Sequence, residues 1–83
     1  MTRGPDPETT AADILGFMTS HPDPGFTARE IADEFDKTRQ WADNRLKAME
    51  EEELLHSKNP GGRARFYWPS HEGKHFLRES QSG

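Results

Sequence analysis

The sequence of 83 residues contains no cysteine and no long hydrophobic run. The lack of cysteine excludes disulfide bonds and metal sites built from thiolates. No apolar run approaches the ~18 residues that a membrane-spanning helix needs. The N-terminus also lacks the apolar segment of a secretory signal peptide. We therefore expect a cytoplasmic protein with no membrane partner.

Hydrophobic residues are scarce as well, at 30% of the chain. A chain of this length has room for one domain and buries only about 60% of the surface that its unfolded form exposes. Its core must therefore be small, and a large enclosed active site is not expected.

The clearest pattern in the chain lies between Phe26 and Leu55 and predicts two short helices joined by a tight turn. Thr27 is an N-cap candidate, and Glu30 three residues later completes a capping box. Ile31 and Phe35, four residues apart, then give the first helix one apolar stripe.

The second helix of this pair begins where the first pattern breaks, at Asp36-Lys37-Thr38. Thr38 can cap it, and its apolar positions Ala42, Leu46 and Met49 are spaced four and three residues apart. These three side chains are predicted to face the core.

The flanking segments predict two further helices. Asp6 and Pro7 favour the start of a helix that runs to about Ser20, before two prolines and a glycine in residues 21–25. A last short helix is expected from about Ser70 to Glu79. We expect residues 1–5 and 80–83 to be disordered and residues 6–79 to form one domain.

Between the last two helices the pattern becomes extended and predicts a β-hairpin. Its strands are expected over residues 54–58 and 63–68, joined by the turn Asn59-Pro60-Gly61-Gly62. The second strand has two alternating faces, one of which must be buried; aromatic bulk favours burial of Phe66 and Trp68, and the choice is left open. One face carries Arg63, Arg65 and Tyr67, and the other carries Ala64, Phe66 and Trp68.

The predicted elements, three helices followed by a hairpin with glycines at its tip, occur in the same order as in a winged helix-turn-helix domain. The runs F-T-A-R-E-I-A-D-E-F, T-R-Q-W-A-D-N-R-L-K-A-M-E-E-E-E-L-L and G-G-R-A-R-F-Y-W-P-S-H-E-G resemble small bacterial and archaeal transcription regulators of the MarR, PadR and ArsR kind. The resemblance covers Asp6 to Leu77 and implies a mainly α fold with a small β-hairpin wing (α+β). It also favours an inward Tyr67.

Three positions depart from the pattern of those families. Asp36 stands where a turn glycine is usual, Lys37 where a small apolar residue is usual, and Glu53 where a glycine commonly ends the recognition helix. Aspartate adopts the left-handed backbone conformation moderately well and glutamate poorly, so the end of this helix is not specified by the resemblance.

The second helix of the pair offers a polar face opposite its apolar one. Asparagine and glutamine side chains can form paired hydrogen bonds with adenine, and arginine or lysine with guanine. The helix start and the basic hairpin tip suit phosphate contacts. The predicted DNA-binding residues are Lys37, Thr38, Arg39, Gln40, Asp43, Asn44, Lys47, Lys58, Arg63 and Arg65.

Two alternatives stand beside this interpretation. A polar face opposite a core stripe is also what any solvated helix shows. A winged helix can instead serve as a protein-interaction module without binding DNA. Trp41, between the two faces of its helix, is expected to pack against a neighbouring element. Double-stranded DNA is the expected partner. Relatives often dimerise through the first or last helices, so a homodimer is left open.

The charge of the chain is unevenly distributed. The net charge is −4, whereas residues 37–49 carry +3 and residues 54–83 carry +3. Positive charge is thus confined to the predicted recognition helix and the hairpin region. The acidic, lysine-poor composition resembles that of proteins from salt-loving archaea, with an ordinary acidic mesophile as the alternative. The run Glu50 to Glu53 is expected to form a solvated helix end away from DNA.

One motif points to an enzyme, and its context argues against it. His71-Glu72-Gly73-Lys74-His75 matches the H-E-x-x-H pattern of zinc proteases. A third ligand is missing, a glycine interrupts the helix, and only eight residues follow. No nucleotide-binding loop or activated nucleophile is identifiable either. We therefore predict no enzyme, no catalytic residue, no metal site and no cofactor.

Overall fold

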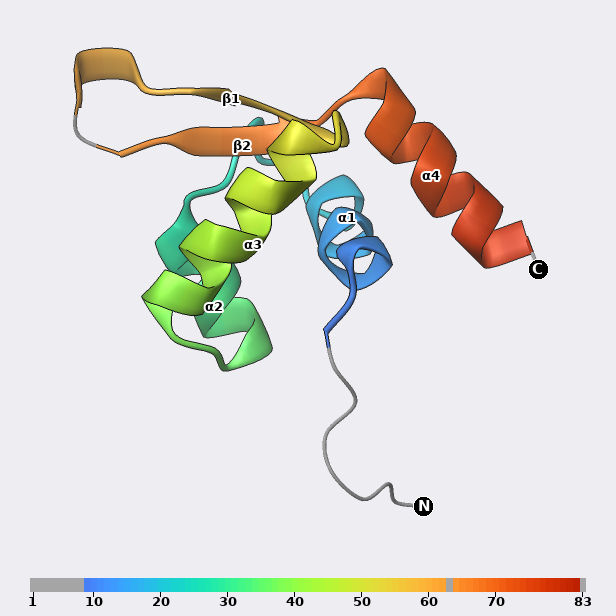
Figure 1. The fold of residues 1–83 in the computed structure, drawn as a ribbon, viewed down its shortest axis with the longest axis horizontal. Helices are drawn as coiled ribbons and strands as arrows, with labels where there is room; N and C mark the ends of the chain where they lie inside the picture. Colours follow the sequence, from blue (N-terminus) through green and yellow to red (C-terminus); the bar gives the residue numbers. More distant parts are fainter. Residues whose placement is uncertain (1–8, 63, 83) are drawn as a thin grey trace.

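The computed structural model describes residues 9–62 and 64–82 (Figure 1). These residues form four α-helices and one antiparallel hairpin, which confirms the expected mainly α fold with a wing and a C-terminal helix. The helices are α1 (Ala11–Ser20), α2 (Ala28–Phe35), α3 (Arg39–Glu51) and α4 (His71–Ser82). The hairpin consists of β1 (Leu55–Lys58), a short 3-10 turn η1 (Pro60–Gly62) and β2 (Phe66–Pro69).

Helix α1 begins later than the sequence predicts. Its N-cap is Thr10, whose hydroxyl accepts from the amide of Asp13 at 3.2 Å, while the Asp13 carboxylate accepts from the Thr10 amide at 2.9 Å. This capping box satisfies two helix-start amides and fixes the boundary at Ala11. The predicted start at Asp6 and Pro7, which lie outside the described residues, is therefore wrong.

The predicted caps of the central helix pair are confirmed. The hydroxyl of Thr27 accepts from the amide of Glu30 at 3.2 Å, and the Glu30 carboxylate accepts from the Thr27 amide at 2.9 Å. The hydroxyl of Thr38 accepts from the amide of Trp41 at 3.0 Å. Both helices therefore begin where the sequence places them.

Two helix exits adopt the left-handed conformation without glycine. Asp36, after α2, has φ 57° and ψ 48°, and the amide of Lys37 donates to the carbonyl of Ala32 at 2.8 Å. Glu53, after α3, has φ 67°. These are two of the three positions at which the sequence departs from the family pattern, so the turn geometry is kept and its usual glycine is replaced.

The hairpin is shorter than predicted but gains a third pairing. Leu55 pairs with Pro69 and Lys58 with Phe66, so residue 54 precedes the first strand and residues 64 and 65 precede the second. Residue 63 lies outside the described residues. Phe26, in the loop before α2, forms an isolated bridge with Tyr67 through two backbone hydrogen bonds of 2.9 and 2.8 Å. This bridge attaches the wing to the helical part of the domain.

The core lies between the three N-terminal helices and the inner face of the hairpin. Tyr67 is 1% exposed, whereas Phe66 is 37% exposed, which settles the orientation of β2 in favour of an inward Tyr67. Phe35, predicted to be inward, is half-buried and packs against the core. The buried apolar residues are Ile14, Leu15, Met18, Phe26, Ala28, Ile31, Ala32, Ala42, Leu46, Met49, Leu54, Leu55 and Tyr67.

Helix α4 packs against α1 on the side of the domain opposite the wing tip (Figure 1). The hydroxyl of Ser70 accepts from the amide of Gly73 at 2.9 Å, which confirms the predicted cap. The helix continues to Ser82, beyond the expected end at Glu79, so residues 80–82 are helical here and residue 83 lies outside the described range. No helix in the described part of the chain has the length and apolar character that a membrane crossing requires.

Candidate nucleic-acid interface

One side of α3 faces away from the domain and carries polar side chains. Gln40, Asn44 and Lys47, spaced four and three residues apart, are exposed, while Ala42, Leu46 and Met49 are buried. The faces predicted for this helix are therefore confirmed. Amide groups and an ammonium group in one row match the hydrogen-bonding groups on base edges in a major groove.

Two cationic side chains lie close to a tryptophan ring near the start of α3. The Lys37 ammonium lies 5.4 Å from the ring centroid of Trp41, and the Arg45 guanidinium lies 5.4 Å from the same centroid. Trp41 is half-buried and packs against the core, as expected. Arg39 and Thr38 are exposed beside it, so the helix start presents amide groups, a hydroxyl and a guanidinium to solvent.

Asp43 flanks the exposed stripe on the side of the wing. It is half-buried, and its carboxylate helps to raise the pKa of the Tyr67 phenol on β2. Its carboxylate is therefore close enough to the Tyr67 phenol to act on it electrostatically.

The wing carries further cationic side chains, which lie on different sides of the hairpin: Arg65 lines a cleft beside α3, whereas Lys58 lines a groove with Phe66 and Trp68. Lys58, at the end of β1, and Arg65, just before β2, are both exposed. Gly61 and Gly62 have φ angles of 75° and 73° at the hairpin tip, which projects beyond the helices (Figure 1). Arg63, the third predicted wing residue, lies outside the described residues.

The wing and α3 meet through a chain of side-chain hydrogen bonds. The Ser57 hydroxyl on β1 donates to Oε2 of Glu50 at 2.6 Å, and Nη1 of Arg65 donates to the Ser57 oxygen at 3.0 Å. A cleft of about 480 Å³ runs along this junction and is lined by Lys47, Glu50, Glu51, Arg65 and Tyr67. The cleft connects the stripe on α3 with the base of the wing.

The floor of this cleft contains a buried phenol. Among residues 9–62 and 64–82, the hydroxyl of Tyr67 has no hydrogen-bond partner. Burial raises the pKa of Tyr67, the carboxylates of Asp43 and Glu50 raise it further, and the guanidinium of Arg65 lowers it. The phenol is therefore uncharged at neutral pH.

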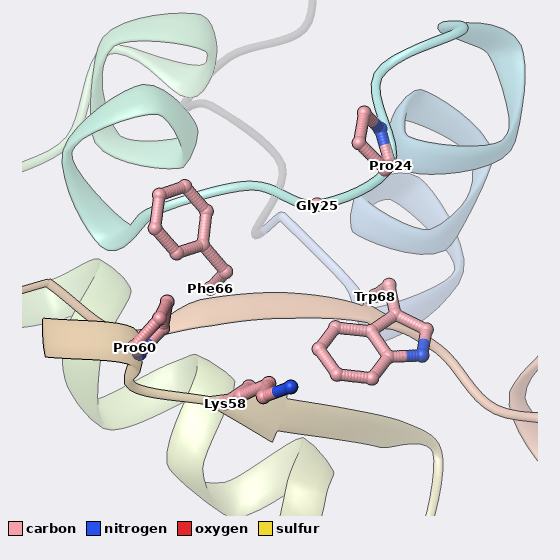
Figure 2. A pocket seen from close by; sticks show the side chains of 6 residues that line it. All are labelled: Pro24, Gly25, Lys58, Pro60, Phe66 and Trp68. Carbon is pink, nitrogen blue, oxygen red and sulfur yellow. The ribbon is translucent and has the colours of Figure 1, made fainter.

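The other side of the hairpin carries an apolar groove of about 300 Å³, lined by Pro24, Gly25, Lys58, Pro60, Phe66 and Trp68. Figure 2 shows the Phe66 ring beside the Pro24–Gly25 segment and the Trp68 ring across β2 toward β1 and Lys58. Phe66 and Trp68 thus line a surface groove, whereas Tyr67, which stands between them in the sequence, is buried in the core.

The H-E-x-x-H segment lies on the first turns of α4 and has a structural explanation. A side chain at Gly73 would collide with the backbone carbonyl of Leu54, so the glycine permits close packing of α4. Nε2 of His75 lies 3.6 Å from Oε2 of Glu79, and both side chains are largely exposed. Across residues 9–62 and 64–82, no group of three or more histidine, aspartate or glutamate side chains is arranged to hold a metal ion.

Comparison with solved structures gives the same fold. MepR, a transcription regulator of the Staphylococcus aureus multidrug efflux pump MepA, superposes with a TM-score of 0.76 at 21% identity, over 87% of this chain and 53% of the MepR chain. The S. aureus MepR–DNA complex gives 0.76 at 20% identity, over 87% and 60%. A mutant of Lactococcus lactis ZitR gives 0.72 at 18% identity, over 99% and 56%.

These similarities establish the fold and leave the function to be argued from the residues. The chain spans 53% to 60% of the three structures that it matches. No protein-family model and no curated protein sequence matches the chain.

Two features of the interface were missed at the level of sequence. The contact of Ser57 with Glu50 and Arg65 joins residues seven and eight positions apart, on different elements. The pairing of Phe26 with Tyr67 joins a loop to a strand across the domain. Neither has a local spacing signal, because the first depends on how the hairpin lies against α3 and the second on how it lies against the loop before α2.

Proposed function

We propose that the chain binds double-stranded DNA with sequence specificity and regulates transcription. In this proposal α3 enters the major groove, and the wing contacts the backbone or the minor groove. The observation that carries it is the shared cleft of Lys47 and Arg65, which joins the exposed stripe of α3 to the base of the wing. The likeness to a transcription regulator that was solved in complex with DNA supports DNA binding.

Each predicted site residue has a chemical role in this arrangement. Gln40 and Asn44 suit paired contacts with adenine, and Arg39 and Lys47 suit guanine or phosphate. Lys37 and the capping Thr38 lie at the start of α3, where its amide groups favour an anion. Asp43 borders the stripe on the wing side and suits a cytosine amino group. The wing residues Lys58, Arg63 and Arg65 are assigned to the sugar-phosphate backbone.

The electrostatic balance favours local binding over general affinity for polyanions. The chain carries a net charge of −4, yet residues 37–49 carry +3. An acidic remainder repels DNA from other faces of the domain and leaves the α3 and wing surface as the attractive side. The proposal assigns no catalytic residue, cofactor or metal ion to the chain.

The symmetry of the preferred DNA site reports on the oligomeric state. A two-fold dimer places two copies of α3 in successive major grooves about 34 Å apart and selects a palindrome. A monomer selects a single half-site. Light scattering of the protein with and without its preferred fragment distinguishes the two.

A mobility-shift comparison of variants tests the proposal. Asn44→Ala should lose about 1 to 3 kcal/mol of discrimination at one base position while keeping general affinity. Arg63→Ala combined with Arg65→Ala should weaken binding to all sequences. Arg78→Ala, which removes an exposed cation from α4, is the matched control and should leave binding unchanged. Equal effects of all three changes would count against the assigned surface.

A second candidate function rests on the groove in Figure 2. An exposed apolar patch often marks a protein-interaction surface, and Phe66 and Trp68 supply one here. In this alternative the domain is a protein-interaction module, and the polar stripe of α3 is a solvated face. A wild-type chain that binds no DNA fragment at any salt concentration would favour it.

A further inference from the structure

The acidic run at the end of α3 does not behave as one solvated patch. Glu51, Glu52 and Glu53 are exposed, whereas Glu50 is half-buried and accepts the hydrogen bond from Ser57. Glu50 therefore faces the wing. This differs from the expectation that the whole run is a solvated helix end.

The direction of the hydrogen bonds among Glu50, Ser57 and Arg65 follows from the chemistry of the three side chains. A carboxylate only accepts hydrogen bonds and a guanidinium only donates them, whereas a serine hydroxyl does both. Ser57 donates to Glu50 at 2.6 Å and accepts from Arg65 at 3.0 Å, so the charge of Glu50 fixes the direction of the hydroxyl. The hydroxyl oxygen is then turned toward Arg65.

This arrangement orients Arg65 without neutralising it. The structure places one hydroxyl between the guanidinium and the carboxylate, and only Nη1 of Arg65 is engaged with Ser57. A guanidinium has five N–H donors. Arg65 is exposed, so its remaining donors can reach a phosphate oxygen in bidentate geometry.

We infer that Glu50 and Ser57 are positioning residues that hold the wing arginine Arg65 ready for a DNA phosphate, so that the negative charge of Glu50 strengthens DNA binding. The inference rests on the proposed function and deepens it. Holding a long side chain in its bound geometry removes part of the entropy cost of binding. The Lys47 side chain in the same cleft adds a second cation next to the phosphate position.

Simple electrostatic repulsion predicts that loss of the Glu50 charge raises DNA affinity, and the positioning role predicts that it lowers DNA affinity. A carboxylate near a polyanion ordinarily weakens binding, so its removal should strengthen binding. Glu51 provides the matched control, because it lines the same cleft and is exposed. Glu51→Gln should raise affinity, because it removes a repulsive charge near DNA and leaves the contacts of Arg65 intact. Glu50→Gln should lower affinity about three- to tenfold, the size expected for a weakened hydrogen bond to a charged group.

A double-mutant cycle separates positioning from a general structural effect. Ser57→Ala should weaken DNA binding about three- to tenfold in the wild-type background and have no further effect in an Arg65→Ala background. Ser57→Thr keeps the hydroxyl and should retain affinity. Thermal unfolding of each variant checks that the fold is intact.

Salt titration gives an independent readout. Loss of one phosphate contact reduces the slope of log affinity against log salt by about one. Ser57→Ala and Glu50→Gln should both show that reduction, and Glu51→Gln should not.

The outcomes distinguish this inference from the proposed function. If the wild-type chain binds no DNA, the proposed function fails and the inference fails with it. If the wild-type chain binds and Glu50→Gln tightens binding as Glu51→Gln does, only the inference is overturned. An undiminished effect of Ser57→Ala in the Arg65→Ala background overturns it as well.

Discussion

The hydroxyl of Ser70 donates a hydrogen bond to the backbone carbonyl of Glu53 at 2.6 Å. The same hydroxyl accepts from the amide of Gly73, and the amide of Ser70 donates to the carbonyl of Leu54 at 3.0 Å. Ser70 is 3% exposed. One buried serine therefore fastens the exit of α3 to the start of α4 and holds Glu53 in its left-handed conformation.

We predict that Glu53→Gly stabilises the protein. Glu53 has φ 67°, a conformation that costs a residue with a Cβ about 1 to 2 kcal/mol and glycine almost nothing. The expected gain in the free energy of unfolding is about 0.5 to 1 kcal/mol after the larger chain entropy of glycine is subtracted. Denaturant titration measures it.

Glu52→Gly is the matched control for this change. It removes the same charge from the neighbouring position, where φ is −86° and glycine brings no conformational relief. It should lower the free energy of unfolding by about 0.5 to 1 kcal/mol. Changes of opposite sign in the free energy of unfolding would support backbone strain at Glu53. Changes of the same sign would contradict it.

We predict that Gly73→Ala destabilises the protein by about 2 kcal/mol or more, because the new Cβ meets the backbone carbonyl of Leu54, which has little room to move. Gly16→Ala, in α1, meets no neighbouring side chain or other element within 4 Å and should stabilise by about 0.5 to 1 kcal/mol. Thermal unfolding of both variants is the measurement. A Gly73→Ala protein as stable as wild type would show that α4 does not pack as closely as described.

Much of the architecture was predictable because its signals are local. The caps at Thr27 and Thr38 depend on a side chain and an amide three residues away, and they were correct. The start of α1 was mistaken because Asp6 and Pro7 form an equally good local signal, while Thr10 and Asp13 form the capping box that the structure uses.

The inward face of β2 was not decided by residue type. Alternation allowed either face to be buried, and the larger aromatic pair, Phe66 and Trp68, lines a groove instead of the core. The bridge between Phe26 and Tyr67 explains the outcome, because it lays β2 against the loop before α2 with the Tyr67 ring inward. Such long-range pairing leaves no trace in sequence spacing.

The polar stripe of α3 followed from helical periodicity, whereas its connection with the wing did not. Gln40, Asn44 and Lys47 are exposed as expected. The link from Glu50 through Ser57 to Arg65 depends on how the hairpin crosses the end of α3. The sequence therefore predicts a solvated end for the whole acidic run, whereas its first member, Glu50, faces the wing.

We predict that Tyr67→Phe stabilises the protein at neutral pH. The Tyr67 hydroxyl is buried and has no hydrogen-bond partner within the described part of the chain, and an unpaired buried polar group costs about 1 to 3 kcal/mol. Removing it should raise the free energy of unfolding by about 1 kcal/mol. A loss of stability would show that the hydroxyl has a bonding partner in solution.

The same residue should make the protein less stable in alkali. The folded-state pKa of Tyr67 is raised above its ordinary value of 10.0, so the unfolded chain releases the proton first. The stability is complete below pH 10.0 and falls as pH rises toward the folded-state pKa. Tyr67 is the single tyrosine of the chain, so phenolate absorbance titrates it directly. The Tyr67→Phe variant should lack this part of the alkaline loss.

Salt should stabilise the free protein. The four consecutive glutamates at residues 50–53 lie at the C-terminal end of α3, where the helix dipole disfavours negative charge. Molar salt shortens the screening length to about 3 Å and weakens this repulsion. The melting temperature should therefore rise between dilute buffer and molar salt, as expected for a salt-adapted protein. An unchanged or lower melting temperature would count against that interpretation.

The central claim is that the surface formed by α3 and the wing binds double-stranded DNA with sequence specificity. The most direct measurement is a mobility-shift assay of the wild-type chain with a library of genomic fragments, at several salt concentrations and with excess unspecific competitor. We predict that a subset of fragments stays bound in the presence of competitor, with an affinity that falls linearly on logarithmic axes as salt rises. The absence of a complex with any fragment at every salt concentration would contradict the account.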